Sequence, residues 1–340
     1  LTEDTWIHTE NGARQIKDLI GKQQSLYVNG ELFSTTPEGF FFTGVKPVLR
    51  VETKEGYSLK LTGNHQLLKV TAQTQKSQYT AWVEAETLQE GDRILLNNHR
   101  GLQAWEGKGT LEEGWLLGNL IGDGCFSESE VNFSHQAKLR YWGETQEVMK
   151  SYALTLSQSI ENAKPAKGFY HSQNKYYEIG SAALFQLAAR YGVTRENKTI
   201  TAKIEEASYA FYCGFLRGLF DADGSVQGTQ EKGTSIRLAQ SNFAMLEAVQ
   251  RMLLRLGVTS AIYQNRRTAG FRFMPDSQKQ PKEYWCQAQH ELVIANDNLP
   301  VFAEVIGFQD PIKAERLEHL LAGYKRNLNR DRFTATIASI

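Results

Sequence analysis

Three features are scarce or missing in this sequence: cysteine, long apolar runs and net charge. The 340 residues include three cysteines, Cys125, Cys213 and Cys286, and 38 basic side chains balance 38 acidic ones. Three widely spaced cysteines argue against a disulfide framework and lack metal-ligand spacing, which favours an intracellular, cytoplasmic protein. No stretch approaches the roughly 20 apolar residues that cross a bilayer, and residues 1–12 lack the basic and apolar regions of a signal peptide, so no membrane partner is expected. Zero net charge argues only weakly against nucleic acid, because binding depends on how charge is distributed over a surface.

The length and texture of the chain predict more than one domain. Residues 1–97 are rich in short strand-like runs, such as 57–70, and contain one short helical stretch near 13–21. After the glycine-rich stretch 100–110, helical periodicity alternates with strand-like runs, which marks a domain boundary. We therefore expect a multi-domain chain, with an all-β module over 1–105 and an α/β (α+β) region from residue 111.

An internal repeat is the most informative feature of the second region. The segment GWLLGNLIGDG at 114–124 matches GFLRGLFDADG at 214–224, and five of the eleven positions are identical. Behind each copy follow a strand-like run, an amphipathic helix, further strands and a helix that ends in a glycine. We therefore expect two halves, 111–210 and 211–328, each in the order α-β-β-α-β-β-α and related by a pseudo-twofold axis.

Small residues recur at every fourth position in both copies of the repeat: Gly114, Gly118 and Gly122 in the first, and Gly214, Gly218 and Ala222 in the second. On a helix this spacing makes a stripe with almost no side chain, which lets two helix backbones approach closely. Asp123 and Asp223 follow directly, each before a glycine that can end the helix. Close packing of the helices therefore brings two carboxylates side by side. Such a pair is unfavourable unless a cation lies between them, and oxygen ligands with open water positions suit magnesium.

Both copies resemble the LAGLIDADG motif, the nine-residue pattern of a homing endonuclease family in which the eighth position is a metal-binding aspartate. That position falls on Asp123 and Asp223. The second copy, LRGLFDADG, is close to the pattern. The first copy, LLGNLIGDG, has Asn119 in place of a leucine and Ile121 in place of an earlier aspartate, which is not the metal ligand in the family.

This resemblance covers about residues 111–325 and implies a metal-dependent nuclease. The metal, magnesium or alternatively manganese, is expected at Asp123 and Asp223 and at the residues before them, Gly122 and Ala222. Each strand of a DNA duplex needs one attack by activated water, which explains why the motif occurs twice. The expected product is a staggered double-strand break at a specific site.

The resemblance also implies polar side chains around the metal. The basic catalytic residue of the family maps to Lys198 in the run NKTI, where Thr201 replaces the usual proline, and Lys313 is its counterpart in the second half. The lysines are expected to stabilise charge that develops on the reacting phosphate. Gln136 and Gln240 follow the first strands of the two halves, where the family places residues that position water.

The antiparallel strands of each half form, in this family, a saddle that lies along the DNA major groove. The run 261–273 interleaves arginine with aromatic residues and reads as a hairpin, and 164–179 occupies the equivalent place in the first half. The candidates for DNA contacts are Lys164, Lys167 and Lys175 in the first half and Arg266, Arg267 and Arg272 in the second. A solvated hairpin face is the alternative, since mixed charge is common on hairpins. The expected partner is double-stranded DNA with a long, asymmetric target, bound by a monomer.

The N-terminal module resembles the Hint fold, the splicing domain of inteins. Residues 1–16 look like the first intein block after its nucleophilic cysteine, and 59–70 contains a Thr-x-x-His pattern at Thr62 and His65. In an intein, this histidine protonates the amide nitrogen at the N-terminal junction, with Thr62 and Asn64 shaping the local hydrogen bonds. The two resemblances together imply an intein with an inserted two-motif homing endonuclease, whose partners include the exteins of a host protein.

Two parts of the intein pattern are not found. The nucleophilic cysteine would precede Leu1, and the closing blocks with a catalytic aspartate and a final His-Asn pair would follow Ile340. Residues 331–340 look like the strand just before those blocks, and we expect this strand to return to the Hint domain. Splicing by this chain alone is therefore not expected.

Two other functions share these motifs. A LAGLIDADG maturase binds RNA and helps it splice without needing nuclease activity, but both aspartates are intact and a splicing module precedes them. An intein that binds DNA without cutting it is the second alternative, and nothing in the sequence shows such decay.

Overall fold

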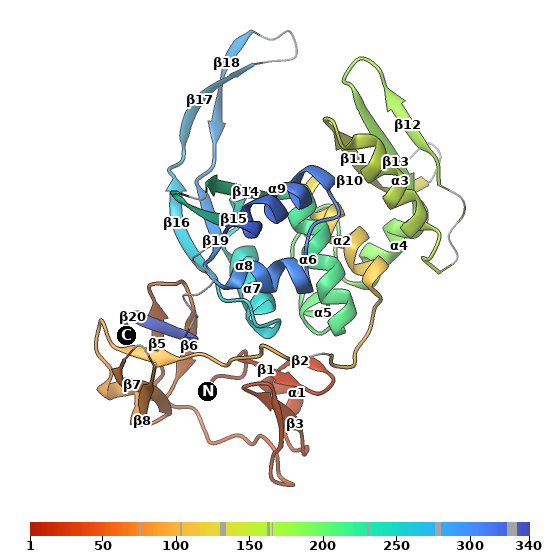
Figure 1. The fold of residues 1–340 in the computed structure, drawn as a ribbon. Coiled ribbons are helices and arrows are strands. Elements are labelled where there is room, and N and C mark those ends of the chain that lie inside the picture. The colour runs from red at the N-terminus through yellow and green to blue at the C-terminus, as the bar shows by residue number, and fades with distance from the viewer. Residues whose placement is uncertain are drawn as a thin grey trace.

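The computed structural model describes residues 1–340 except 75, 103, 130–133, 162–163, 165, 230, 276–279 and 325–331. Figure 1 shows β-sheets at one end of the molecule and, at the other, two groups of strands on either side of a central helix pair. Within the described part of the chain, no helix is long and apolar enough to cross a membrane. The end of the predicted second half and the start of the predicted returning strand fall in 325–331, outside the described residues.

The first sheet is built from the N-terminal strands and packs on the helical region. It comprises β1 (Trp6–Thr9), β2 (Gly12–Gln15), β3 (Ser25–Val28) and β4 (Glu31–Ser34), in the order β2-β1-β3-β4, with the short helix α1 (Ile16–Leu19) after β2. Arg14 Nη1 donates to the carbonyl oxygen of Glu206 at 3.0 Å, and the Trp105 indole donates to that of Ala207 at 3.0 Å. Trp105 is buried in the same core as the helices, so this sheet is anchored to the helical region.

The second sheet has six strands and a core of its own. Its elements are β5 (Leu49–Thr53), β6 (Ser58–Leu61), β7 (Gln66–Gln73), β8 (Gln78–Glu84), the 3-10 turn η1 (Ala85–Thr87), β9 (Arg93–Leu95) and β20 (Thr334–Ser339), and the order is β6-β5-β20-β9-β7-β8. Its buried apolar residues are Val51, Leu61, Ala85, Leu88, Ile94, Ala335 and Ile337. The sequence predicts one all-β module over 1–105, whereas the strands of that range lie in two sheets with separate cores. Residues 41–48, which connect the two sheets along the chain, form no strand.

Strand β20 joins the two ends of the chain within the second sheet. It lies between β5 and β9, and Thr334 is the register partner of Leu95. The Leu96 N–H donates to the carbonyl oxygen of Phe333 at 2.6 Å. The residue at which the chain leaves this sheet and the residue at which it returns are therefore hydrogen-bonded to each other.

The first half of the helical region follows the predicted order α-β-β-α-β-β-α. Its elements are α2 (Leu111–Asp123), β10 (Cys125–Ser129), β11 (Ser134–Trp142), α3 (Gln146–Ser157), β12 (Gly168–His171), β13 (Tyr176–Ser181) and α4 (Ala182–Arg190), followed by the short helix α5 (Ala202–Glu205). The strands pair antiparallel in the order β10-β11-β13-β12.

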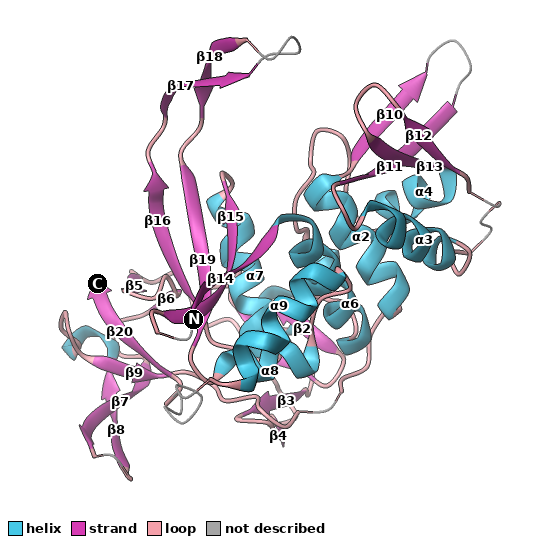
Figure 2. Cartoon of the chain, turned by 45° about the horizontal axis from the view of Figure 1, so that its top comes forward, coloured by secondary structure: helices cyan, strands magenta, loops and turns pink. Residues whose placement is uncertain are grey.

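The second half repeats this order with an added pair of strands. Its elements are α6 (Tyr209–Asp223), β14 (Gly224–Thr229), β15 (Gly233–Gln240), α7 (Phe243–Arg255), β16 (Ala261–Arg267), β17 (Gly270–Pro275), β18 (Pro281–Cys286), β19 (Gln289–Ala295), α8 (Asn298–Val305) and α9 (Pro311–Ala322). The order β14-β15-β19-β16 matches the first half, and β17 pairs with β18. Both groups of strands project to the same side of the helix pair (Figures 1 and 2).

The predicted hairpin over 261–273 is wrong. β16 pairs with β19 and β17 pairs with β18, so 261–275 is one side of a long ribbon whose return strand is 281–295. The residues Thr268–Gly270 look like a turn in the sequence but mark only the break between β16 and β17. Strands β17 and β18 are antiparallel, and Pro275 is the register partner of Pro281.

Local capping signals define where the central helices begin. Thr110 and Glu113 form a reciprocal capping box at the start of α2, and Ser208 caps α6 through the Phe211 N–H. Both motif helices are therefore held at their N-termini, and their C-termini point toward the strands.

Candidate active site

Helices α2 and α6 touch along the predicted small-residue stripes. A Cβ added at Gly118 would lie 2.0 Å from the carbonyl oxygen of Phe215, and one at Gly218 would lie 2.1 Å from that of Trp115. Such distances are too short for any side chain, so the two backbones pack directly against each other. The predicted close approach of the helices is confirmed.

The close packing brings the two motif aspartates together. Asp123 and Asp223 are the last residues of α2 and α6. A Cβ at Gly122 would lie 2.4 Å from Cβ of Ala222 and 3.4 Å from Oδ2 of Asp223. The helix ends are thus in contact where the carboxylates emerge, and the charge of Asp123 acts on Asp223.

Burial and mutual repulsion disfavour the charged forms of these two groups. Desolvation raises the pKa of Asp123, and desolvation together with the nearby Asp123 charge raises the pKa of Asp223 to about 6. Across the described residues, no three His, Cys, Asp or Glu side chains cluster as a metal site. A cation held here would therefore rely on the two carboxylates, backbone carbonyls and water, an oxygen-only set that suits a hard divalent ion.

The two predicted lysines lie at the ends of the motif helices. Lys198 Nζ donates to the carbonyl oxygens of Gly122 at 3.2 Å and Gly124 at 2.8 Å. Lys313 Nζ donates to the carbonyl oxygens of Phe220 at 3.1 Å and Ala222 at 3.5 Å. Positive charge is favourable at a helix C-terminus, so each lysine stabilises the helix end that presents its aspartate.

The lysines are also partly desolvated beside the aspartates. Burial lowers the pKa of Lys198 and of Lys313, and both aspartates oppose that shift. The carbonyl oxygens of Gly122 and Ala222, which are candidate metal ligands, already accept bonds from these lysines. A carbonyl oxygen has a second lone pair, so a metal and a lysine can share each of them.

The two predicted glutamines behave differently. Gln240 Nε2 donates to Oδ2 of Asp223 at 2.5 Å, which lowers the pKa of that carboxyl. Gln136 pairs with Ser127 near the start of β11. The matching registers of Cys125 with Lys138 and of Ser225 with Arg237 place Tyr141 at the position of Gln240. The expectation that Gln136 is the counterpart of Gln240 is therefore wrong.

Asp221 is a buried residue whose role the motif comparison missed. Its Oδ1 accepts from the backbone N–H groups of Gln309 at 2.9 Å and Asp310 at 3.0 Å, and its Oδ2 accepts from the Trp115 indole at 2.8 Å. Asp310 in turn caps α9, the helix that carries Lys313. Asp221 thus fixes α9 against both motif helices, and the earlier aspartate of the motif is a positioning residue.

The predicted DNA-contact residues are all exposed but are spread along the ribbons. Lys164 and Lys167 precede β12, and Lys175 lies in the β12–β13 turn. Arg266 and Arg267 end β16 and line a cavity of about 200 Å³ that also contains Asp223. These two arginines therefore lie beside the aspartate site.

Arg272 lies farther along the same ribbon, on β17, where it donates to the Thr268 carbonyl oxygen at 3.0 Å. The sequence missed three cations on the open faces of the sheets. Lys138 and Arg140 lie on β11, and Arg237 lies on β15. These three side chains can be assigned to the open faces only when the alternation of side chains along each strand and the pairing of the strands are both known.

The Thr-x-x-His segment lies in the second sheet, between β6 and β7. The His65 N–H donates to the Thr62 carbonyl oxygen at 3.0 Å, and the exposed Asn64 lies within this turn. The Thr2 N–H donates to the carbonyl oxygen of Lys60 at 3.3 Å, so the first residues run beside the same turn. Desolvation lowers the pKa of His65.

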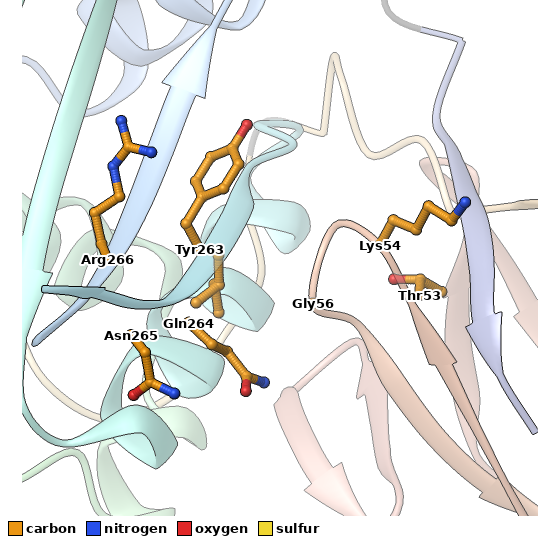
Figure 3. Close-up of a pocket in the computed structure, with 8 residues that line it drawn as sticks. Thr53, Lys54, Gly56, Tyr263, Gln264, Asn265 and Arg266 are labelled. Atoms are coloured by element: carbon orange, nitrogen blue, oxygen red, sulfur yellow. The ribbon is translucent and has the colours of Figure 1, made fainter. Parts of the chain in front are cut away.

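The second sheet and the second half meet in a polar cavity of about 490 Å³. Figure 3 shows Tyr263, Gln264, Asn265 and Arg266 on one side and the turn Thr53–Gly56 on the other. The Ile262 N–H donates to the carbonyl oxygen of Glu55 at 2.9 Å. The β5–β6 turn is therefore docked beside the base of the long ribbon.

Comparison with known families identifies the second half. A family model described as a LAGLIDADG-like domain matches residues 210–307. Residues 210–307 are therefore similar to this family. The matched segment includes α6, with Asp223 at its end, and all the strands of the second half.

Curated relatives match between about three quarters and all of the chain at low identity. The ribonucleoside-diphosphate reductase NrdEB subunit alpha of Bacillus subtilis is 25% identical over 376 residues, covering 100% of this chain and 33% of the relative. The replicative DNA helicase DnaB of Rhodothermus marinus is 26% identical over 289 residues, covering 77% of this chain and 28% of the relative. The chain thus spans about a third or less of the length of these relatives.

Solved structures of homing endonucleases are also similar to part of the chain. Mesophilic variants of the homing endonuclease I-DmoI match 58% of this chain and 95% of theirs at 18% identity, with a TM-score of 0.39. I-DmoI in complex with DNA and Mn gives a TM-score of 0.38 at 17% identity, over 58% of this chain and 96% of that one.

Proposed function

We propose that this chain is a metal-dependent, site-specific DNA endonuclease of the homing type. The observation that carries the proposal is the pairing of Asp123 and Asp223 at the ends of two helices that touch backbone to backbone. Each of these aspartates has a lysine at its own helix end. One reaction centre for each DNA strand follows from this duplication.

The donor set of the site fits magnesium, with manganese as a substitute. Asp123 and Asp223, together with the carbonyl oxygens of Gly122 and Ala222, offer only oxygen ligands. When bound, the ion activates water and stabilises the departing oxygen. Lys198 and Lys313 place positive charge beside the aspartates, where negative charge grows on the phosphate. Gln240 holds Asp223 in one orientation.

The open faces of the two four-stranded sheets are proposed to bind the duplex. A major groove admits a two-stranded ribbon and displays a distinct donor and acceptor pattern for each base pair. Exposed cations on these ribbons supply phosphate contacts and base contacts, and the former give affinity while the latter give specificity. Because the two halves differ in side chains, the target they read is long and asymmetric. Both halves belong to one chain, so a monomer suffices.

The short separation of the aspartates also bears on the cut. Two adjacent reaction centres reach phosphates on opposite strands only where those phosphates face each other across the narrow minor groove. Phosphates paired in this way are offset along the duplex, so we propose staggered ends.

We further propose that the second sheet belongs to a protein-splicing module of the Hint type, with host-protein exteins as its partners. The Thr62–His65 turn lies beside residues 1–2, so a peptide bond before Leu1 would lie near His65. The whole endonuclease region lies between Leu96 and Phe333, which are hydrogen-bonded neighbours. Relatives with unrelated names, a reductase and a helicase, each match most of this chain. An intervening sequence is expected to occur in proteins that are otherwise unrelated, as this segment does.

The endonuclease proposal is tested by cleavage of a library of randomised DNA duplexes with magnesium. Asp123→Asn and Asp223→Asn should each lower cleavage by at least about a hundredfold, because a metal ligand and its charge are lost. DNA binding should survive, since both sheets stay intact. Asp18→Asn, at an exposed position on α1, is the matched control. Unchanged cleavage by both variants would refute the site, and failure of the wild type to bind or cut any duplex would refute the function.

The splicing proposal needs a separate test. An upstream protein joined through a cysteine to Leu1 should be released by a thiol, and His65→Ala should slow release by about tenfold or more because general acid catalysis is lost. His319→Ala, at an exposed position on α9, is the control. Release that is equally fast without His65 would remove the support for a Hint module.

A further inference from the structure

Two glutamates occupy matching positions on the open faces of the two four-stranded sheets. Leu139 pairs with Ile179 in the first half, and Leu238 pairs with Leu292 in the second, and all four side chains are buried. Glu178 and Glu291 directly precede Ile179 and Leu292, so they project from equivalent positions on the opposite, open face. The duplication has therefore kept a carboxylate at the centre of each face.

The Glu178 carboxylate lies between two cations. Lys138 Nζ lies 2.8 Å from Glu178 Oε1, and Arg140 Nε lies 2.9 Å from Glu178 Oε2. The glutamate side chain is 12% exposed, and His171 Nε2 lies 4.0 Å from its Oε1. Each carboxylate oxygen thus has one near donor.

Glu291 also lies beside two cations in the second half, although one of them comes from a different strand. Arg237 Nη1 lies 3.0 Å from Glu291 Oε2, and Arg266 Nε lies 3.5 Å from the same oxygen. Arg237 lies opposite Ser225 just as Lys138 lies opposite Cys125, so these two cations are equivalent too. The Lys138–Glu178 and Arg237–Glu291 pairs are therefore copies of one feature.

General affinity for DNA does not account for these carboxylates. On a face that binds DNA, a carboxylate repels phosphates and occupies the cations that could neutralise them. Each glutamate–cation pair places a hydrogen-bond acceptor, the carboxylate, next to a donor, the cation. The carboxylate can still accept, because each of its oxygens has lone pairs beyond those that the cations use.

That pattern matches the major-groove edge of one kind of base pair. A C·G pair presents the N4 amino donor of cytosine beside the O6 and N7 acceptors of guanine. Carboxylates accept from cytosine N4, and lysine or arginine donates to guanine.

We propose that each glutamate, with its cation, reads one C·G pair in its half of the target. Glu178 accepts from cytosine N4 while Lys138 or Arg140 donates to guanine, and Glu291 does the same with Arg237. Since the two copies are related by the pseudo-twofold axis, the two C·G pairs lie at equal distances from the cleavage centre and in inverted orientation. This inference rests on the proposed function, because it needs the duplex to lie along both sheets.

The test is selection of cleaved targets from a randomised duplex library with magnesium. The wild type should show a preference of about tenfold or more for C·G at two symmetric positions. Glu178→Gln should lose that preference at one position only, and Glu291→Gln at the other. Glutamine pairs with adenine, so the preferred base at the affected position should move toward adenine. Affinity for unrelated duplex should rise in both variants because a repulsive charge is removed.

Glu147→Gln is the matched control. Glu147 pairs with Lys150 on α3 of the same half and is 60% exposed, so its removal should leave every base preference unchanged. Thermal unfolding should confirm that all variants fold. If one of the two glutamine variants does not fold, the base preference of the variant in the other half tests the inference. A target without symmetric C·G pairs, or preferences that survive both substitutions, would overturn this inference while leaving the nuclease proposal standing. Failure of the wild type to bind or cut any duplex would instead overturn the proposed function.

Discussion

The two halves of the helical region share their chemistry but differ in what supports it. Each half has a motif helix ending in an aspartate, a lysine at that helix end and a glutamate–cation pair on its open face. Around the second aspartate the support is heavier, because Asp221 fixes α9 and Gln240 holds Asp223. The first half has Ile121 and Tyr141 at these positions. Both halves thus keep the aspartate, the lysine and the glutamate–cation pair, whereas the residues that surround the aspartates differ.

The halves also differ in reach. The added strands β17 and β18 extend the second ribbon well beyond the sheet, as Figure 2 shows. Phe271, Phe273 and Trp285 on this extension are each at least 60% exposed. The first half has no such extension among its described strands. The second half can therefore contact more of a partner than the first.

The largest effect should come from breaking what the halves share. Gly218→Leu places a side chain where even Cβ would lie 2.1 Å from a backbone oxygen, and overpacking of this kind costs about 3 kcal/mol or more. Thermal unfolding should show loss of the helical core, and cleavage should disappear with it. Gly270→Ala, where nothing lies within 4 Å, should be nearly neutral. A stable, active Gly218→Leu protein would mean that the helices do not pack through this stripe.

Asp221→Asn should separate the halves functionally. The amide cannot accept from both the Trp115 indole and the two N–H groups before α9, and an unsatisfied buried group costs about 1–3 kcal/mol. Lys313 should lose its position, so one DNA strand should be cut about tenfold or more slowly, and nicked circles should accumulate on a plasmid target. Ile121→Val, the matched change in the first half, should cut both strands at normal relative rates. Equal slowing of both strands by Asp221→Asn would contradict this asymmetry.

The pH dependence of cleavage should report Asp223. Its pKa is raised to about 6, and the metal needs the ionised form, so single-turnover cleavage should rise with pH through about 6 and then level off. The hydrogen bond from Gln240 lowers this pKa, so Gln240→Met should move the midpoint to higher pH. Gln136→Met should leave it in place. If the midpoint of the pH profile is the same in Gln240→Met as in the wild type, a group other than Asp223 controls the rate.

The smallest effect should come from the arginines at the base of the second ribbon. If Arg266 and Arg267 contact phosphates, replacing both with alanine should reduce the slope of log K against log salt by about 0.9 for each contact. The same measurement on Lys164→Ala with Lys167→Ala tests the first half. If the arginines read guanine edges instead, the slope should hold while preference at one or two base pairs relaxes. An unchanged slope and unchanged preference would place β16 away from DNA.

The sequence predicts the parts of the site that the repeat preserves in register. The offset between the halves is 100 residues at the aspartates (223 − 123), so the motif helices and their glycine stripes can be aligned by eye. At the glutamates the offset is 113 residues (291 − 178), because the extended ribbon adds chain to the second half. Only strand pairing shows that Glu178 and Glu291 are equivalent.

The errors have a similar origin. Gln136 resembles Gln240 in its place after the motif, but pairing of β10 with β11 puts it at the far end of its strand. Thr268–Gly270 has the composition of a turn, yet its neighbours pair with β18 and β19 rather than with each other. No local sequence pattern marks the role of Asp221, because its partners, Trp115 and the start of α9, are distant in sequence. In each case tertiary pairing decided what local pattern could not.

The hydrogen bond between Leu96 and Phe333 has a consequence for how such a molecule could arise. In the topology of the six-stranded sheet, the whole segment between these two residues takes the place of a single loop between β9 and β20, and the ends of that loop are in contact. The entropy cost of closing a loop grows only slowly with its length, by about 0.6 kcal/mol for each doubling, so a long insertion costs the sheet only a few kcal/mol more than a short turn. The junction therefore fits the proposed splicing module, because sequence can be added or removed between Leu96 and Phe333 without breaking a strand of the six-stranded sheet.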